Sequence, residues 1–288
     1  MNTPNTPRPR KWSQIPYAGT SQVPFPEESS GGTWSTFTLN SDEKGVFLDP
    51  FGQKITWDVR HPDTIDFKKD QLEQVKNTLK NLSKKQITIA EYWNAGPPTK
   101  QFNPIIDRLI DTYKMSALRA TRILAAVHAG IHDTLIVTWY LKYLWEVPRP
   151  NQLDQKLATI CCTPKHPSYP AGHATVAGCI ETILRYFFPT ESQQLHKLTE
   201  ECSISRLYAG VHYPIDLTEG LRLGRQIGQM VVDKLKQDHD GNQVKLDYTI
   251  TENLHANLMP PPYKQMIPFP RGRNCDSLLD PREDPDAR

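Results

Sequence analysis

The 288-residue sequence lacks the features of several large protein classes. No run of about 18 consecutive apolar residues is present, and the start, MNTPNTPRPRKW, contains no apolar stretch typical of a secretion signal. The formal net charge is only +2, so neither sign is in the excess that attracts nucleic acid or an anionic membrane. We therefore expect a soluble, cytoplasmic protein without nucleic-acid or membrane partners, in which any anion-binding site is local.

Cysteine is also scarce. The five cysteines are odd in number and include no C-x-x-C pair, which disfavours both a disulfide framework and a zinc site. A chain of this length can bury a full hydrophobic core without cross-links. We therefore predict reduced thiols at Cys161, Cys162, Cys179, Cys202 and Cys275.

Strand patterns are almost absent. Apolar and polar residues alternate only between about 34 and 59, on both sides of a Pro50-Phe51-Gly52 turn, which predicts one β-hairpin. Both ends of the chain, residues 1–32 and 258–288, are rich in proline and polar residues, as is typical of irregular arms.

Helical patterns dominate from about residue 69, where apolar residues such as Leu72, Val75, Leu79 and Leu82 recur at spacings of three and four. A short helix is predicted over IAEYWNAG, and the next is expected to begin with Asn103 as its cap and Pro104 at its first position. Further helices are predicted from Ser116 to just before Pro148, and over 174–188, 192–202 and 214–236.

These patterns predict an all-α fold, a helical bundle with a small N-terminal β-hairpin. The expected organisation is an irregular N-terminal arm, hairpin and first helix at 1–85, the bundle at 86–240, and a Pro-rich C-terminal arm packing on the bundle at 241–288.

Three short motifs stand at predicted helix ends. Lys142 and Arg149, close to two helical turns apart, end the long central helix, although such cations often only complement a helix C-terminus. In HPSYPAGHATVAG, residues 166–178, Gly172 and His173 open a helix whose free N–H groups suit an oxyanion, and the alternative is a plain histidine cap.

The third motif combines Arg206 with a histidine and an acid. Asp216 falls in the first turn of the helix that begins at Pro214, where it can accept from one nitrogen of His212 and leave the other free. An ordinary first-turn acid and a surface arginine are the alternative. Lys142, Arg149 and Arg206 brought together in a bundle would cost several kcal/mol without a balancing anion, so the three motifs jointly favour a tetrahedral oxyanion site.

Together the motifs resemble those shared by the type 2 phosphatidic acid phosphatases and the vanadium-dependent haloperoxidases. They read Lys142-x6-Arg149-Pro150, Pro170-Ala171-Gly172-His173 and Ser205-Arg206-x5-His212-x3-Asp216. The resemblance extends over about residues 86–237, includes similarity to the soluble haloperoxidase branch, and implies a helical bundle of the haloperoxidase or acid phosphatase type.

The resemblance implies a role for each motif residue. Lys142, Arg149 and Arg206 would bind oxygens of vanadate, or of phosphate in the same site, and the Gly172 amide would add a donor. His173 would be the acid–base residue, His212 would bond the vanadium, and Asp216 would orient His212. Ala171 lies in the cofactor-binding motif where the family has serine, which removes a hydrogen bond worth about 1–3 kcal/mol to a charged acceptor.

For activity, the resemblance implies hydrogen peroxide and a halide as substrates, with Lys142 polarising the peroxide. His166, in the substrate pocket, favours bromide or iodide over chloride. Two alternatives stay open: a soluble phosphomonoesterase with a phosphohistidine intermediate, and a non-catalytic oxyanion-binding relic. The organic acceptor and assembly into a homo-oligomer are not determined by the sequence.

A second histidine group lies within the central helix. His128, His132 and Asp133 have helical spacing, but no glutamate follows His128 to form the H-E-x-x-H motif of zinc enzymes. We expect these side chains to be packed and hydrogen bonded, with Asp133 and Trp139 as scaffold.

Overall fold

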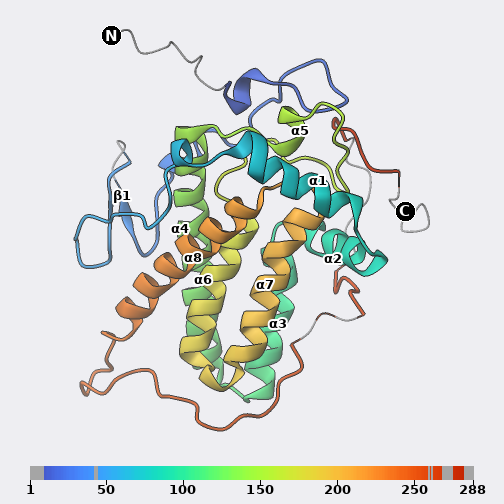
Figure 1. Ribbon diagram of the computed structural model, residues 1–288. Helices are drawn as coiled ribbons and strands as arrows, with labels where there is room; N and C mark the ends of the chain where they lie inside the picture. The colour runs from blue at the N-terminus through green and yellow to red at the C-terminus, as the bar shows by residue number, and fades with distance from the viewer. Residues whose placement is uncertain (1–9, 42–44, 259, 261, 268–274, 282–288) are drawn as a thin grey trace.

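The structure is a bundle of α-helices with a two-stranded sheet at one side (Figure 1). It is a computed structural model that describes residues 10–41, 45–258, 260, 262–267 and 275–281. The predicted all-α class with a small N-terminal hairpin is confirmed. The α-helices are α1 (Leu72–Lys80), α2 (Lys84–Asn94), α3 (Thr99–Thr112), α4 (Ala117–Trp145), α5 (Pro150–Leu153), α6 (Gly172–Phe187), α7 (Ser192–Tyr208) and α8 (Pro214–Leu235).

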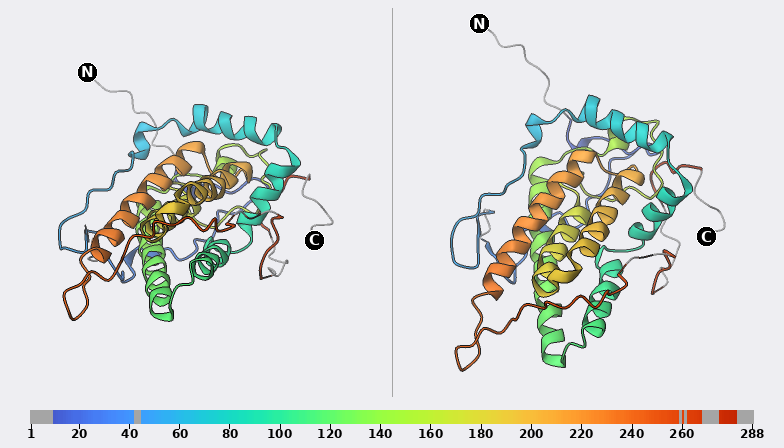
Figure 2. Two further views of the ribbon diagram at one scale, coloured as in Figure 1. Left: turned by 90° about the horizontal axis from the view of Figure 1, so that it is seen from below. Right: turned by 60° about the horizontal axis from the view of Figure 1, so that its bottom comes forward.

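Helix α6 lies at the centre of the bundle and packs on α4, α7 and α8 (Figure 2). Most of its residues are buried, because small and apolar side chains occur on several faces. Its contact with α8 is close: a Cβ atom added to Gly224 would lie 1.9 Å from the Thr175 carbonyl oxygen. The approach of these two backbones brings the start of α6 next to the start of α8, where the Ala171 amide donates to the Asp216 carbonyl.

The long helix α4 has clear start and stop signals. The Ser116 side chain caps its N-terminus by accepting from the Arg119 amide. At the other end Glu146 adopts a left-handed conformation, φ 49°, and the chain then turns through Pro148 into the short helix α5. The stop predicted before Pro148 is therefore confirmed.

The hairpin differs in detail from the prediction. Strands β1 (Asn40–Ser41) and β2 (Phe47–Leu48) pair antiparallel, with Asn40 opposite Leu48. The expected Pro50-Phe51-Gly52 turn follows β2 and closes only an isolated bridge between Leu48 and Lys54. Short strands suffice here because Phe47 is buried against Trp57 and Tyr140.

Three helix boundaries were predicted wrongly. Helix α2 begins at Lys84, after the Ser83 cap, and not at Ile89. Helix α3 begins at Thr99, so Asn103 is not its cap and Pro104 lies inside the helix. Buried side chains on both sides of Pro104, including Phe102 and Ile105, hold the helix across this residue. Helix α7 continues to Tyr208 rather than ending at Cys202, which places Arg206 in its last helical turn.

The described parts of both arms contact the bundle. Near the N-terminus Trp12 is buried, its amide donates to the Glu146 carbonyl, and its own carbonyl accepts from Gln152. After α8 the chain runs along one end of the bundle (Figure 1), where Asp247 accepts from Arg122 and the Ala256 amide donates to Glu191.

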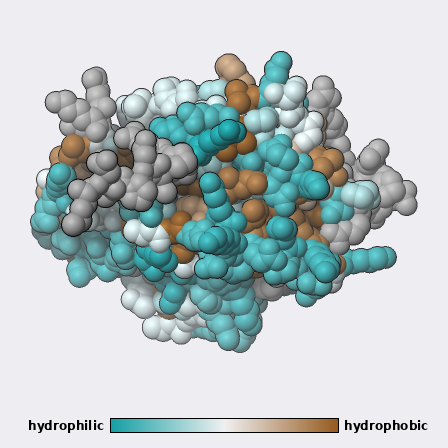
Figure 3. All heavy atoms as spheres, turned by 45° about the horizontal axis from the view of Figure 1, so that its top comes forward, coloured by the Kyte–Doolittle hydropathy of each residue, from teal (hydrophilic) through white to brown (hydrophobic). Residues whose placement is uncertain are grey.

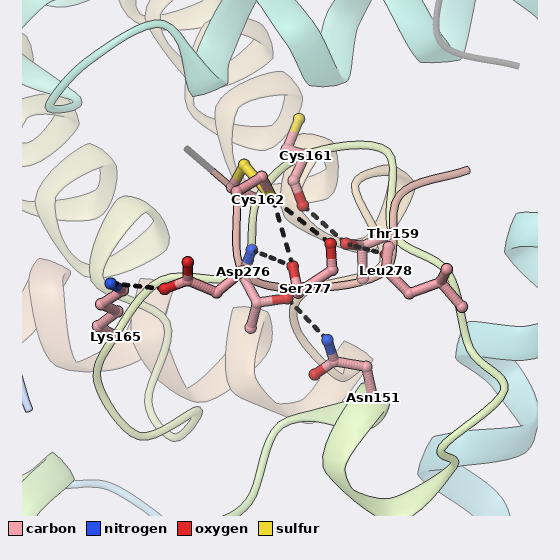
Figure 4. Close-up of a disulfide and its surroundings, with 10 residues drawn as sticks. Asn151, Thr159, Cys161, Cys162, Lys165, Asp276, Ser277 and Leu278 are labelled. Atoms are coloured by element: carbon pink, nitrogen blue, oxygen red, sulfur yellow. Dashed lines mark hydrogen bonds and ion pairs between the residues drawn. A yellow bond between two sulfur atoms is a disulfide. The ribbon is translucent and has the colours of Figure 1, made fainter. Parts of the chain in front are cut away.

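The prediction of five reduced cysteines is wrong. Cys162 and Cys275 form a disulfide across 113 residues (Figure 4). Cys161, Cys179 and Cys202 are free and buried. Sequence spacing could not reveal the pair, because the C-terminal segment returns to the 159–165 loop only in the folded chain. Since disulfides persist in oxidising compartments, the cysteine pattern no longer supports the expected reducing cytoplasm.

Within the described parts of the chain, no helix has both the length and the apolar character needed to cross a membrane. With the α1 and α5 end of the molecule turned forward, the surface is mainly hydrophilic, with smaller hydrophobic areas between the polar residues (Figure 3).

Candidate active site

The residues of the three motifs meet at one end of the bundle. Helices α4 and α7 end there and α6 and α8 begin there (Figure 1). The members are Lys142 in the last turn of α4, Arg149 at the N-cap of α5, Ala171, Gly172 and His173 at the start of α6, Arg206 in the last turn of α7, His212 before α8, and Asp216 in its first turn.

His212 is held between an acid and a cation. Its Nδ1 lies 2.8 Å from Asp216 Oδ2, and its Nε2 lies 2.9 Å from Arg149 NH1. Because a guanidinium group only donates hydrogen bonds, Nε2 must be the acceptor and Nδ1 must carry the proton. The contacts therefore assign the tautomer that leaves the His212 lone pair on the side of the cations.

Backbone carbonyl groups orient two of the three cations. Lys142 Nζ donates to the carbonyls of Pro167 and Ser168 at 2.5 and 2.7 Å. Arg149 donates to the carbonyls of Val211 and His166 at 2.7 and 3.0 Å. Lys142 and Arg149 are both fully buried, so these neutral acceptors are their immediate hydrogen-bond partners in place of water.

Arg206 is buried with fewer partners than donors. Its NH2 donates to Asn94 Oδ1 at 2.9 Å, but its Nε and NH1 are buried without a hydrogen-bond partner. Buried polar groups in proteins nearly always have partners, so unpaired donors on a buried cation suggest that an acceptor binds there.

The start of α6 leaves space beside the cations. Ala171 is the fully buried N-cap residue and makes no side-chain cap bond. A Cβ atom added to Gly172 would meet only the Trp139 ring, at 3.8 Å, so packing within the protein does not require glycine here. The His173 Nε2 lies 3.0 Å from the Trp93 carbonyl oxygen at the end of α2.

His166 contacts the same group. Its Nδ1 lies 3.1 Å from Arg149 NH2, and its ring packs against Trp139 with centroids 4.6 Å apart and a tilt of 41° between the planes. Trp139 therefore lies beside both His166 and the start of α6, as expected of a scaffold residue.

The site contains more buried positive charge than negative charge, and this affects the pKa values of its side chains. Burial, followed by the charges of Arg149, Lys142 and Arg206, lowers the pKa of His212 well below its usual value. Burial and then Arg206 do the same to the pKa of His173. Burial also lowers the pKa of Arg149 to about 10 and that of Lys142 well below its usual range. An anion among these groups would favour their charged forms.

Asp216 is the one acid within this set of residues. Its Oδ2 accepts from His212, from Ser168 Oγ at 2.5 Å and from the Tyr213 amide at 3.1 Å. Burial raises the pKa of this carboxyl group to about 6, against the opposing effects of Ser168 and Lys142. One buried carboxylate cannot balance three cations, which fits a site for a multiply charged oxyanion.

Several residues that contact the motif residues were not predicted, and three of them come from outside the motifs as quoted or lie far from their partners in the sequence. They are Ser168, whose hydroxyl reaches Asp216, Asn94, which accepts from Arg206, and Trp93, whose carbonyl faces His173. Ser168 lies within the quoted loop, but nothing in the local pattern indicates that its partner is Asp216. Trp93 and Asn94 end α2, and no spacing rule connects them to residues 80 or more positions away.

The second histidine group is hydrogen bonded, as predicted, but only Asp133 is fully buried, and His128 is exposed rather than packed. Asp133 accepts from the amides of Phe37, Thr38 and Leu39, and thereby anchors the segment before β1. His132 contacts the Ser35 carbonyl, and His128 contacts the Leu124 carbonyl. In the ranges that the structure describes, no group of three or more His, Cys, Asp or Glu residues is arranged to hold a metal ion.

Comparison with known proteins relates part of this chain to one superfamily and to bromoperoxidases. Residues 120–237 match the sequence model of the PAP2 superfamily. Vanadium-dependent bromoperoxidases from Corallina pilulifera and Corallina officinalis are 33% and 32% identical over 99 residues. The match covers 25% of this chain and only 17% of the length of each of these relatives.

Solved structures share the fold. A bacterial vanadium-dependent iodoperoxidase has a TM-score of 0.60 at 20% identity, over 76% of this chain and 60% of that one. The apo form of a bacterial vanadium-dependent chloroperoxidase has a TM-score of 0.62 at 12% identity, over 81% of this chain and 63% of that one. The helical arrangement described above is thus that of the haloperoxidases.

Proposed function

We propose, from the match of residues 120–237 to the PAP2 superfamily model and the similarity to vanadium haloperoxidases in sequence and fold, that this chain is a vanadate-dependent haloperoxidase. In this proposal it uses hydrogen peroxide to oxidise bromide or iodide.

The observation that carries the proposal is the buried cation group around His212. Lys142, Arg149 and Arg206 all lower the pKa of this histidine, and Arg206 has two buried nitrogens without partners. A tetrahedral oxyanion supplies acceptors for those donors and negative charge for the cations. The residues present therefore fit vanadate, and they fit phosphate equally well.

In the proposed site Lys142, Arg149, Arg206 and the Gly172 amide hold oxygens of the oxyanion. His212 contributes the Nε2 lone pair, for which Arg149 NH1 must give up its present bond. Asp216 retains the proton on the other nitrogen. When bound, vanadate supplies a Lewis acid that activates hydrogen peroxide towards a halide without redox change of its own.

The proposed proton carrier is His173. It lies among the same cations, and burial and Arg206 keep it neutral in the absence of an anion. A neutral imidazole can accept a proton from hydrogen peroxide, and the negative charge of a bound oxyanion would stabilise the resulting imidazolium. Lys142 would polarise the peroxide, and His166 with Trp139 would line the halide side of the site.

A paired assay on metal-free protein tests the proposal. Orthovanadate with hydrogen peroxide and bromide or iodide should halogenate a phenol indicator. A phosphomonoesterase, which would use His212 as nucleophile, would instead hydrolyse p-nitrophenyl phosphate and be inhibited by vanadate. A relic would bind phosphate or vanadate and do neither.

The variant His212→Ala should abolish turnover while its far-UV circular dichroism stays that of the parent. The matched control is His128→Ala. His128 lies on α4 outside the candidate site, and its hydrogen-bond partners are the Leu124 carbonyl and the Asn103 side chain. Turnover retained in His212→Ala would mean that the site is misassigned.

A further inference from the structure

Ser168 connects the two sides of the candidate site. It is fully buried in the loop before α6, and its Oγ lies 2.5 Å from Asp216 Oδ2 and 3.4 Å from His212 Nδ1. Since Nδ1 already donates to Asp216, the Ser168 hydroxyl proton goes to the carboxylate and not to the imidazole.

The Asp216 carboxylate depends strongly on this hydroxyl. All of its hydrogen-bond donors meet at Oδ2, namely the His212 Nδ1, the Tyr213 amide and Ser168 Oγ. The other oxygen, Oδ1, is buried without a partner. Ser168 therefore supplies one of three donors that compensate the burial of this carboxylate and determine how it is rotated.

The backbone of Ser168 is fixed from the opposite side. Its amide donates to the Val147 carbonyl at 2.9 Å, and its carbonyl accepts from Lys142 Nζ at 2.7 Å. One residue thus contacts both the lysine at the end of α4 and the acid that orients His212 on the α8 side.

We propose that Ser168 is a positioning residue. It holds the Asp216 carboxylate, and through it the His212 imidazole, in a fixed orientation relative to Lys142. The proposal rests on the proposed function in one respect, that an oxyanion binds beside His212. It assigns no proton transfer to Ser168, because the hydroxyl contacts only the orienting acid and the edge of the imidazole.

The test is a double-mutant cycle on inorganic phosphate affinity, measured by calorimetry with the full chain. The Ser168→Ala change should weaken binding roughly tenfold, as for the loss of one hydrogen bond to a charged group. In an Asp216→Asn background the same change should weaken binding less than about twofold, because the group through which Ser168 acts has lost its charge.

Two further variants separate positioning from packing. Ser168→Thr keeps the hydroxyl and should restore phosphate affinity to within about threefold of the parent. Thr138→Val is the matched control, since it removes a buried hydroxyl on α4 that bonds only to the Thr134 carbonyl, and it should leave affinity unchanged.

A readout without any anion keeps the inference separate from the proposed function. Long-range ¹H–¹⁵N spectra of the parent should show one set of sharp His212 ring resonances, with the chemical shifts of the Nδ1–H tautomer. The Ser168→Ala change should shift and broaden these resonances. Equal losses of phosphate affinity in both backgrounds, or a His212 spectrum unchanged by Ser168→Ala, would overturn the positioning role. A parent that binds neither phosphate nor vanadate would overturn the proposed function, and the spectra would still decide the role of Ser168.

Discussion

Replacing Arg206 by methionine should stabilise the anion-free protein while removing its response to an oxyanion. Arg206 is almost completely buried, and its Nε and NH1 have no hydrogen-bond partner. A buried donor without a partner costs about 1–3 kcal/mol, so the two together cost about 2–6 kcal/mol. The bond to Asn94 that the variant loses offsets about 1 kcal/mol of this.

Methionine retains much of the apolar contact of the arginine stem, so the net expectation is an unfolding free energy about 1–5 kcal/mol higher than that of the parent. Phosphate at a hundred times its dissociation constant should add about 2.7 kcal/mol to the parent. The variant should gain less than about 1 kcal/mol, because it lacks one of the proposed oxyanion donors.

Urea unfolding followed by far-UV circular dichroism, with and without phosphate, measures both quantities. Arg225→Met is the matched control, since Arg225 pairs with Glu181 and Glu200 outside the site. That control should lose stability in both conditions and keep the full phosphate response. If Arg206→Met were destabilised by about 2 kcal/mol or more without phosphate and still responded fully, the unpaired-donor reasoning would be refuted.

Three further outcomes are expected. Ala171→Ser should tighten vanadate binding about tenfold by restoring one hydroxyl donor, and calorimetry showing equal affinities would contradict this account. Reduction of the Cys162–Cys275 disulfide, or its replacement by two serines, should lower the unfolding free energy by about 2–4 kcal/mol, and a change below about 1 kcal/mol in urea unfolding would count against it. Because the pKa of buried His212 is lowered in the folded protein, the unfolded chain binds a proton on this residue at a higher pH than the folded chain does. The unfolding free energy should therefore fall as the pH drops below about 6.5, by up to ~1.4 kcal/mol per pH unit from this group. Asp216, with a pKa raised to about 6, opposes this trend below pH 6, and His212→Gln should flatten the urea-derived profile.

Local patterns in the sequence were enough for most helices. Capping residues such as Ser116 and stop signals such as Pro148 act within a few residues, so their effect can be inferred without the fold. Helix α3 shows the limit of this approach: Pro104 indicated a helix start, but burial of the neighbouring apolar residues continued the helix through it.

The residues of the candidate site were also largely indicated by short motifs. The spacing of His212 and Asp216 predicted a contact within one helical turn, and the structure has it at 2.8 Å. The proposed roles of the motif residues, from Lys142 to Asp216, came from the resemblance to a family and remain predictions for the assays above.

The sequence by itself thus determined the helical class, most helix ends and the residue types of the proposed oxyanion site, because these depend on interactions between near neighbours in the chain. Only the tertiary structure decided that Ser168 contacts Asp216, that Arg206 retains unpaired donors beside Asn94, and that Cys162 meets Cys275. Those contacts join segments 48 to 113 residues apart, and such pairs meet only when the packing of α6 against its neighbours has brought the helix ends together.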